Sequence, residues 1–177
     1  GTLTLTGANT YTGTTSISGG VLQLGTNGSL SSSTALSMSS TGVLDLYGNS
    51  QTFASLTGAS GNQIYNTKTA TNSTLTISGG TTTYAGQIVD NAGSGTGKVA
   101  LTLNGGTLTL SGANTYTGVT TVNAGSGADT KLLLSGSGAI ASSSGVTLNG
   151  GSTYKAILDL SSTSSGASIV TLTLSLI

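Results

Sequence analysis

The 177-residue chain contains no Cys, Pro, His, Arg, Glu or Trp. Without cysteine it can form neither a disulfide nor a thiolate metal site, and without histidine it lacks the usual base that activates a nucleophile. The only cations are lysines, and they are scattered at Lys68, Lys98, Lys131 and Lys155. Binding to nucleic acid or to an anionic membrane surface requires clustered cations, so the composition argues against both kinds of partner.

Long apolar runs are also missing, and the longest aliphatic stretch is Leu132–Leu134. A membrane-spanning helix needs about 20 apolar residues, so we expect no membrane insertion by this segment. The chain opens without the basic segment of a signal peptide. It starts and stops inside strand-like patterns, at residues 1–6 and 167–177, which predicts that it is a fragment of a longer protein.

The residues that are present alternate strictly between polar and apolar types. The pattern runs through residues 2–6, 74–78, 107–111 and 170–176, with Leu, Ile or Val at every second position and Thr or Ser between them. Successive side chains of a β-strand point to opposite faces, so each run predicts a strand with an apolar and a hydroxyl-bearing side.

Helix signals are weak, because the chain lacks Glu and Arg and carries 29 glycines. Each glycine costs a helix about 1 kcal/mol relative to alanine. The strands are separated by Gly-Gly and Asn-Gly pairs, whose residues tolerate the positive φ of tight corners. The sequence therefore predicts an all-β chain with essentially no α-helix.

An internal repeat organises these strands. Residues 1–13 read GTLTLTGANTYTG and residues 106–118 read GTLTLSGANTYTG, so only Thr6 and Ser111 differ. Stacked coils let such strands hydrogen-bond to the coils above and below, which predicts a β-solenoid with Leu on Leu and Thr on Thr. A Greek-key sandwich is the second choice.

The corners of the repeat allow a more detailed prediction. We expect Asn9 and Asn114 to lie at corners where stacked asparagine amides hydrogen-bond to one another. We expect Tyr11 and Tyr116 to pack beside these corners.

The thirteen-residue cassette, followed by Thr-Thr and a Gly-flanked strand such as residues 19–25, resembles the passenger-associated repeat of bacterial autotransporters. Residues 72–88 resemble the strand element just upstream of that repeat. The resemblance implies a right-handed parallel β-helix in the passenger domain of a type V secretion protein. It also implies a covalently linked C-terminal β-barrel translocator outside this chain.

On this basis residues 1–177 form a single β-helix fragment of a passenger, with repeat cassettes at 1–25 and 106–125 and a degenerate echo at 72–90. The second copy departs from the family pattern at Gly125–Thr130, where an inserted segment replaces a direct run into the next strand. This insertion affects the expected coil length and leaves the expected fold unchanged.

Catalysis would require convergent reactive groups, and the best candidates are the paired carboxylates used by glycosidases. Asp45 and Asp159 occupy matching positions in 43–46 and 157–160, where we expect each to face solvent. Residues 125–129 resemble half of a calcium-binding nonapeptide, but such sites need consecutive repeats and this segment occurs once, so we predict a loop. For residues 90–93 we predict a turn. We predict no catalytic residue, no metal site and no cofactor.

The favoured function is a non-catalytic stalk on the surface of a Gram-negative bacterium, or secreted from it, which also aids export by folding outside the outer membrane. The alternative is an adhesin, with an outward ladder (Thr2, Thr4, Thr6, Thr107, Thr109 and Ser111) that meets host surfaces, glycans or sister passengers. Ice binding is disfavoured because the Thr-x-Thr motif is interrupted along the sequence. A polysaccharide-acting enzyme is disfavoured for want of reactive groups.

Overall fold

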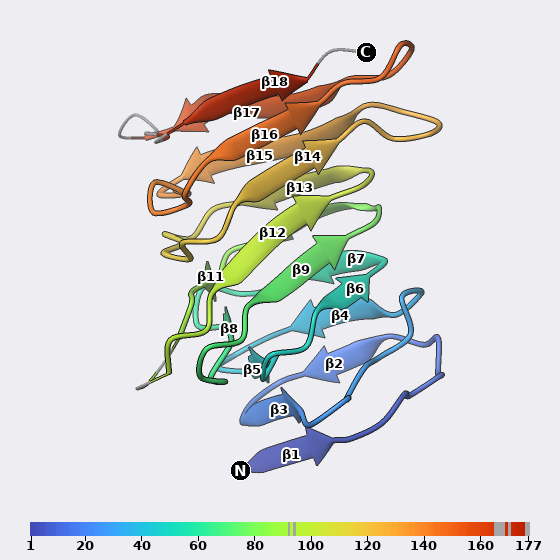
Figure 1. Ribbon diagram of the computed structural model, residues 1–177, viewed down its shortest axis with the longest axis vertical. Coiled ribbons are helices and arrows are strands. Elements are labelled where there is room, and N and C mark those ends of the chain that lie inside the picture. Colours follow the sequence, from blue (N-terminus) through green and yellow to red (C-terminus); the bar gives the residue numbers. More distant parts are fainter. Residues whose placement is uncertain (92, 94, 165–168, 170, 176–177) are drawn as a thin grey trace.

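The structure is a computed structural model that describes residues 1–91, 93, 95–164, 169 and 171–175. These residues form strands, turns and loops and contain no helix, so the all-β prediction is confirmed. The strands stack along one long axis, with the N-terminus at one end and the C-terminus at the other (Figure 1).

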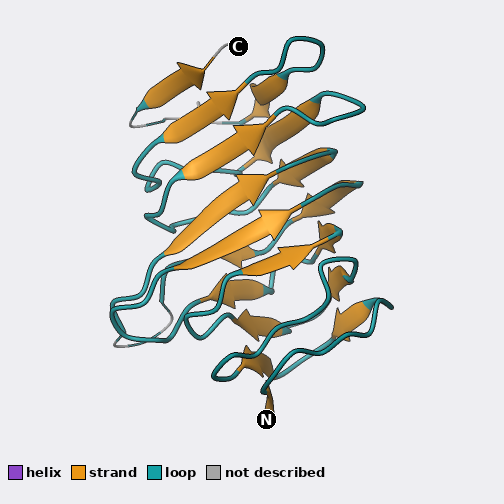
Figure 2. Cartoon of the chain, turned by 45° about the vertical axis from the view of Figure 1, so that its right-hand side comes forward, coloured by secondary structure: helices purple, strands orange, loops and turns teal. Residues whose placement is uncertain are grey.

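The stacked strands form three faces of the molecule. The side face carries β1 (Thr2–Leu5), β3 (Val21–Leu24), β5 (Val43–Asp45), β8 (Gln63–Tyr65) and β11 (Gln87–Ile88). The front face carries β6 (Gln51–Phe53), β9 (Ser73–Ile77), β12 (Val99–Leu103), β14 (Thr120–Asn123), β16 (Val146–Asn149) and β18 (Leu172–Ser175), whose strands run side by side in Figure 2.

The back face consists of two sheets that continue into each other. The first holds β2 (Thr15–Ile17), β4 (Ala35–Met38) and β7 (Ser55–Thr57), and the second holds β10 (Thr81–Tyr84), β13 (Thr107–Leu110), β15 (Thr130–Gly136) and β17 (Ala156–Thr163). A parallel bridge between Gly58 and Tyr84 joins them, and the Ala85 amide donates to the Gly58 carbonyl at 2.9 Å.

Every strand pair among the described residues is parallel, which rules out the antiparallel sandwich. Paired strands belong to successive coils, and the coils differ in length, since Val21 follows its partner Thr2 more closely along the chain than Val99 follows Ser73. The chain is thus a β-solenoid of about six turns, as the repeat predicts. Its right-handed sense stays a prediction.

The core is a set of apolar files that run along the solenoid. On the side face Leu22, Leu44, Ile64 and Ile88 lie in register, and on the front face Phe53, Ile77, Leu103 and Val122 do so. All are buried, and each such side chain contributes about 1.5–3 kcal/mol relative to exposure. Leu3 and Leu174, on the outermost coils, are 61% and 60% exposed.

The two copies of the repeat do not stack on each other. In the first copy β1 lies on the side face, whereas in the second copy β13 lies on the back face. The coils from β5 to β13 carry a strand on all three faces, while the coils after β12 alternate between front and back faces only. The echo strand β10 is the direct neighbour of β13, with Thr81 on Thr107 and Thr83 on Thr109.

Candidate functional site

The two aspartates that formed the candidate carboxylate pair lie on different faces of the solenoid. Asp45 ends β5 on the side face, and Asp159 lies in β17 on the back face, paired with Leu133. The matching positions inferred from the sequence are therefore wrong. The short Leu-Asp-Leu strings look alike only because alternation with Asp at the polar position suits both strands.

Asp45 is also not exposed to solvent as expected, because only 1% of its surface is accessible. Its carboxylate accepts hydrogen bonds from Gln23 Nε2 at 2.8 Å, the Tyr47 amide at 2.9 Å, and Thr67 through its amide at 3.1 Å and its hydroxyl at 2.6 Å. Burial, together with the negative charge of Asp45, raises the pKa of Tyr65 on the next coil. A buried carboxylate held by four donors acts as a structural clamp between coils.

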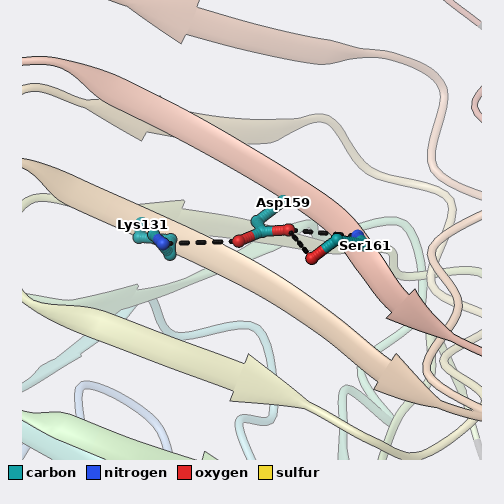
Figure 3. Close-up of polar contacts among 3 residues, drawn as sticks. All are labelled: Lys131, Asp159 and Ser161. Atoms are coloured by element: carbon teal, nitrogen blue, oxygen red, sulfur yellow. Dashed lines mark hydrogen bonds and ion pairs between the residues drawn. The ribbon is translucent and has the colours of Figure 1, made fainter.

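Asp159 makes a surface interaction instead (Figure 3). Its carboxylate accepts from the Ser161 hydroxyl at 2.7 Å and the Ser161 amide at 3.0 Å, and it pairs with Lys131 Nζ at 3.3 Å. These hydrogen bonds from Ser161, followed by the one from Lys131, lower the pKa of Asp159. The pair joins β15 to β17 across adjacent coils.

The other two aspartates hold loops in place. Asp90 accepts from the Val99 amide at 2.9 Å and from the amide and hydroxyl of Thr117 at 2.9 and 2.6 Å. Asp129, in the 125–129 loop, accepts from the Lys155 amide at 2.8 Å. In the 90–93 segment, position 92 lies outside the described residues. Among the residues that the structure places, no three potential ligands come together as a metal site would require.

The corner asparagines of the repeat make the same Nδ2 contacts in both copies. Asn114 Nδ2 donates to the carbonyls of Gly112 and Ala139 at 2.8 and 3.0 Å, and Asn9 Nδ2 donates to those of Gly7 and Ser29 at 3.2 and 3.0 Å. The expected asparagine–asparagine bonds at these corners are wrong, because coils with different corner residues lie next to them.

The expected packing of tyrosine beside the corner is confirmed for Tyr116, whereas Tyr11 keeps the equivalent hydrogen bond at the surface. Tyr116 shares a 2.7 Å hydrogen bond with the Thr120 hydroxyl, and Tyr11 shares a 2.9 Å bond with that of Thr15. Tyr116 is fully buried, and this burial raises its pKa, whereas Tyr11 on the first coil is 44% exposed. The same local motif therefore has a buried and an exposed version in one chain.

An asparagine ladder does exist, at a place that the sequence did not indicate. On the front face Asn123 Nδ2 donates to Asn104 Oδ1 at 2.7 Å, and Asn149 Nδ2 donates to Asn123 Oδ1 at 2.7 Å. Asn104 directly follows β12, while Asn123 and Asn149 are the last residues of β14 and β16, and each comes after an apolar residue: Leu103, Val122 and Leu148. That shared apolar-Asn ending was the signal available in the sequence.

The most regular surface feature is a file of threonines on the front face, which we call the threonine file. One threonine at the centre of each strand lies in register with the next, and no rung is missing: Thr52, Thr76, Thr102, Thr121, Thr147 and Thr173. The outward ladder expected at Thr107 and Thr109 is shorter, since Lys131 and Leu133 occupy the next coil. The sequence hides the threonine file because its members lie a whole coil apart along the chain and at unequal intervals, as Thr76, Thr102 and Thr121 show.

A shallow groove of about 300 Å³ borders the threonine file near the beginning of the front-face strands. Its lining is mostly uncharged and includes the exposed Val119 and the side chain of Lys98. The front face thus offers an extended, hydroxyl-bearing surface, and Asp90 lies at its edge, bound to the Val99 amide at the start of β12 and to Thr117 of the groove lining. The hydroxyl groups of this face can donate and accept hydrogen bonds to a partner.

Comparison with protein families agrees with this architecture. The model of the passenger-associated transport repeat matches the chain at residues 1–24 and again at residues 103–126. The first match contains β1, β2 and β3, and the second contains β13 and β14 with the corner between them. No curated protein and no solved structure gives a significant match.

Proposed function

Because two passenger-associated transport repeats on a β-solenoid fit an autotransporter passenger domain, we propose that this chain is a non-catalytic structural segment of such a passenger. In this role it is a rigid stalk, displayed on the surface of a Gram-negative bacterium or secreted from it. The whole passenger is joined to a C-terminal translocator, as passenger-associated repeats imply for autotransporters. The described residues contain no helix long and apolar enough to cross a membrane.

The observation that carries the proposal is the continuity of the core from coil to coil. Apolar files on two faces meet inside the solenoid, and backbone hydrogen bonds connect every strand to its neighbours along the axis. Parallel strands lie about 4.8 Å apart, so six coils span about 29 Å. Bending such a rod would break hydrogen bonds on one side and open the core on the other, which gives stiffness without charge.

The fate of the aspartates supports the non-catalytic part of the proposal. Asp45, Asp90 and Asp129 accept backbone amide hydrogens, and Asp159 is bound to Ser161 and Lys131. Each carboxylate therefore has a structural partner within its own or a neighbouring coil. In this arrangement the acids stabilise loops and coil contacts.

Coil-by-coil stacking also supports a role in export. In a repeat protein each unit contacts only its neighbours, so folding can propagate from one coil to the next. A narrow pore admits the chain only while it is extended. A coil that has folded outside the outer membrane is too wide to pass back through that pore. Folding of this segment would thereby favour outward movement of the chain.

Small-angle X-ray scattering of the purified chain tests the stalk. We expect the scattering profile of a rod, with the same cross-section at every protein concentration measured. The core variant Leu101→Asp should lose that shape. Thr109→Asp is the matched control, since Thr109 is the outward residue of an equivalent Leu-Thr-Leu strand and should keep it. A disordered or expanded scattering profile for the unmodified chain would refute the stalk.

Export is tested in the complete autotransporter with the same two variants. Leu101→Asp should reduce the amount of passenger that external protease can reach, and Thr109→Asp should not. Equal surface display of both variants would contradict the export role while leaving the stalk intact.

Adhesion is the second candidate function, and the threonine file is the observation that favours it. Cells that display the Thr102→Lys variant would then lose attachment or aggregation although the passenger still reaches the surface. Unchanged attachment would refute adhesion through the threonine file, and the stalk would remain as the proposed function.

A further inference from the structure

The threonine file combines regular spacing with a uniform side chain. Successive rungs are adjacent strands of one parallel sheet, so their spacing is about 4.8 Å throughout. Threonine is β-branched and restricted at χ1, so each rung presents its hydroxyl and its methyl group with little rotational freedom. The front face therefore presents a regular row of threonine side chains with little rotational freedom.

The hydroxyls of the threonine file have no hydrogen-bond partner among the residues that the structure describes. None of the six makes a hydrogen bond to another group of the described chain, in contrast to the bonded hydroxyls of Thr67, Thr117 and Thr120. Each threonine is partly accessible to solvent rather than buried. Their bonds are therefore made to water or to a partner outside the chain.

The files on either side of the threonines carry neither charge nor aromatic rings. Residues two positions before and after each threonine share its face. They are small or amide side chains: Ser50, Thr74, Ala100, Val119, Gly145 and Thr171 on one side, and Ala54, Ser78, Asn104, Asn123, Asn149 and Ser175 on the other. Lys98 lies beyond these files, at the border of the groove.

We propose that the front face, centred on the threonine file, orders its first layer of water in register with the coils and binds ice through that layer. A periodic row of free hydroxyls is best matched by a partner with the same period that offers both donors and acceptors. The rows of hexagonal ice have a repeat close to the strand spacing, and ice carries no charge. The threonine methyl groups neither donate nor accept hydrogen bonds, so water above them bonds to neighbouring water.

The composition of the face separates ice from the other uncharged partners. A sugar surface would be expected to use aromatic side chains as platforms, and none lies on these three files. A second copy of the face would have to bury six unbonded hydroxyls against identical groups, and hydrogen bonds must then form to offset their lost hydration. Ice replaces the water already bound to these hydroxyls by water of the same chemistry.

Incorporation of the purified chain into a slowly growing ice front is the test. The chain should be enriched in the ice relative to a non-binding protein of similar size, and it should also slow ice recrystallisation. Thr102→Lys should abolish most of the enrichment, because it places a charged, mobile side chain in the middle of the file. Thr109→Lys, which changes the same Leu-Thr-Leu context on the back face, is the matched control and should keep it.

Circular dichroism shows whether each variant is folded. If Thr102→Lys is unfolded, Thr121→Lys and Thr147→Lys test other positions of the threonine file. Exclusion of the folded chain from ice would overturn the inference, as would equal loss in the front-face and back-face variants. Binding to an insoluble neutral polysaccharide without ice enrichment would overturn it in favour of a glycan. Front-face-dependent dimers without ice enrichment would overturn it in favour of a second copy. None of these outcomes affects the scattering test of the stalk.

Discussion

Removing the Asn114 side chain tests whether the repeat corners hold neighbouring coils together. Asn114 is only 3% exposed, and its Oδ1 accepts the amide hydrogen of the buried Ile88 on the preceding coil at 2.9 Å. Its Nδ2 bridges the carbonyls of Gly112 and Ala139. One side chain therefore connects three successive coils.

The expected cost of Asn114→Ala follows from these contacts. The Ile88 amide would be left buried without a partner, which costs about 1–3 kcal/mol. The Ala139 carbonyl keeps the Asn114 backbone amide at 3.2 Å, so the lost Nδ2 bonds add only about 1 kcal/mol. We expect the free energy of unfolding to fall by about 2–4 kcal/mol in total.

The first copy of the repeat supplies the matched control. Asn9 makes the corresponding Nδ2 bonds but lies on the first coil, where its Oδ1 accepts no amide hydrogen from the described residues. Asn9→Ala should therefore cost only about 1 kcal/mol, the worth of its donor bonds. Urea unfolding followed by circular dichroism measures both changes, and hydrogen exchange of the Ile88 amide should accelerate in Asn114→Ala alone.

Two results would refute this reasoning. Equal destabilisation by the two substitutions would show that the buried amide contributes nothing beyond the shared corner bonds. An unchanged exchange rate at Ile88 would show that another group, or water, satisfies the amide once the side chain is gone.

Three further predictions concern packing and pH. Gly112→Ala should destabilise the protein by about 1–3 kcal/mol in urea unfolding, because its Cβ would collide with the Gly86 carbonyl oxygen. In the control Gly127→Ala the new Cβ meets nothing within 4 Å, so stability should change by less than about 0.5 kcal/mol. Similar destabilisation by both substitutions would contradict the close packing at Gly112. Burial raises the pKa of Tyr116, so stability should be complete below pH of about 10, where unfolded tyrosine ionises, and fall above it. Tyr116→Phe should flatten that alkaline slope in unfolding curves, and an unchanged slope would exclude the buried phenol as its source. The pKa of Asp159 is lowered, so its stabilising effect should be present above pH of about 4 and fade as the pH falls through the folded-state value. Asp159→Asn should remove this acid-side loss, and identical acid titrations of both proteins would contradict it.

The sequence was a sound guide wherever a local pattern decides the structure. Alternation fixes which residues of 74–78 and 107–111 face inward, since a slip by one residue would turn every leucine to solvent. The repeated Gly-Ala-Asn-Thr-Tyr-Thr-Gly corner makes the same asparagine Nδ2 bonds in both copies, and the same bonds from Tyr11 to Thr15 and from Tyr116 to Thr120. The single-domain boundary of 1–177 stays a prediction.

The sequence was a poor guide wherever the answer depends on which coil lies next. Asp45 looked like a solvent-facing strand residue, but Gln23 and Thr67 of the neighbouring coils cover it and bind its carboxylate. The resemblance between 43–46 and 157–160 suggested a shared position, and the two strands lie on different faces.

Strands, corners and an all-β solenoid were thus determined by the sequence alone, because side-chain alternation and the φ preferences of Gly and Asn act within a few residues. Coil length, which is shorter from Thr2 to Val21 than from Ser73 to Val99, was decided only in the tertiary structure. The register between coils follows from how apolar files pack across the core, and it alone aligns six threonines that are separated along the chain.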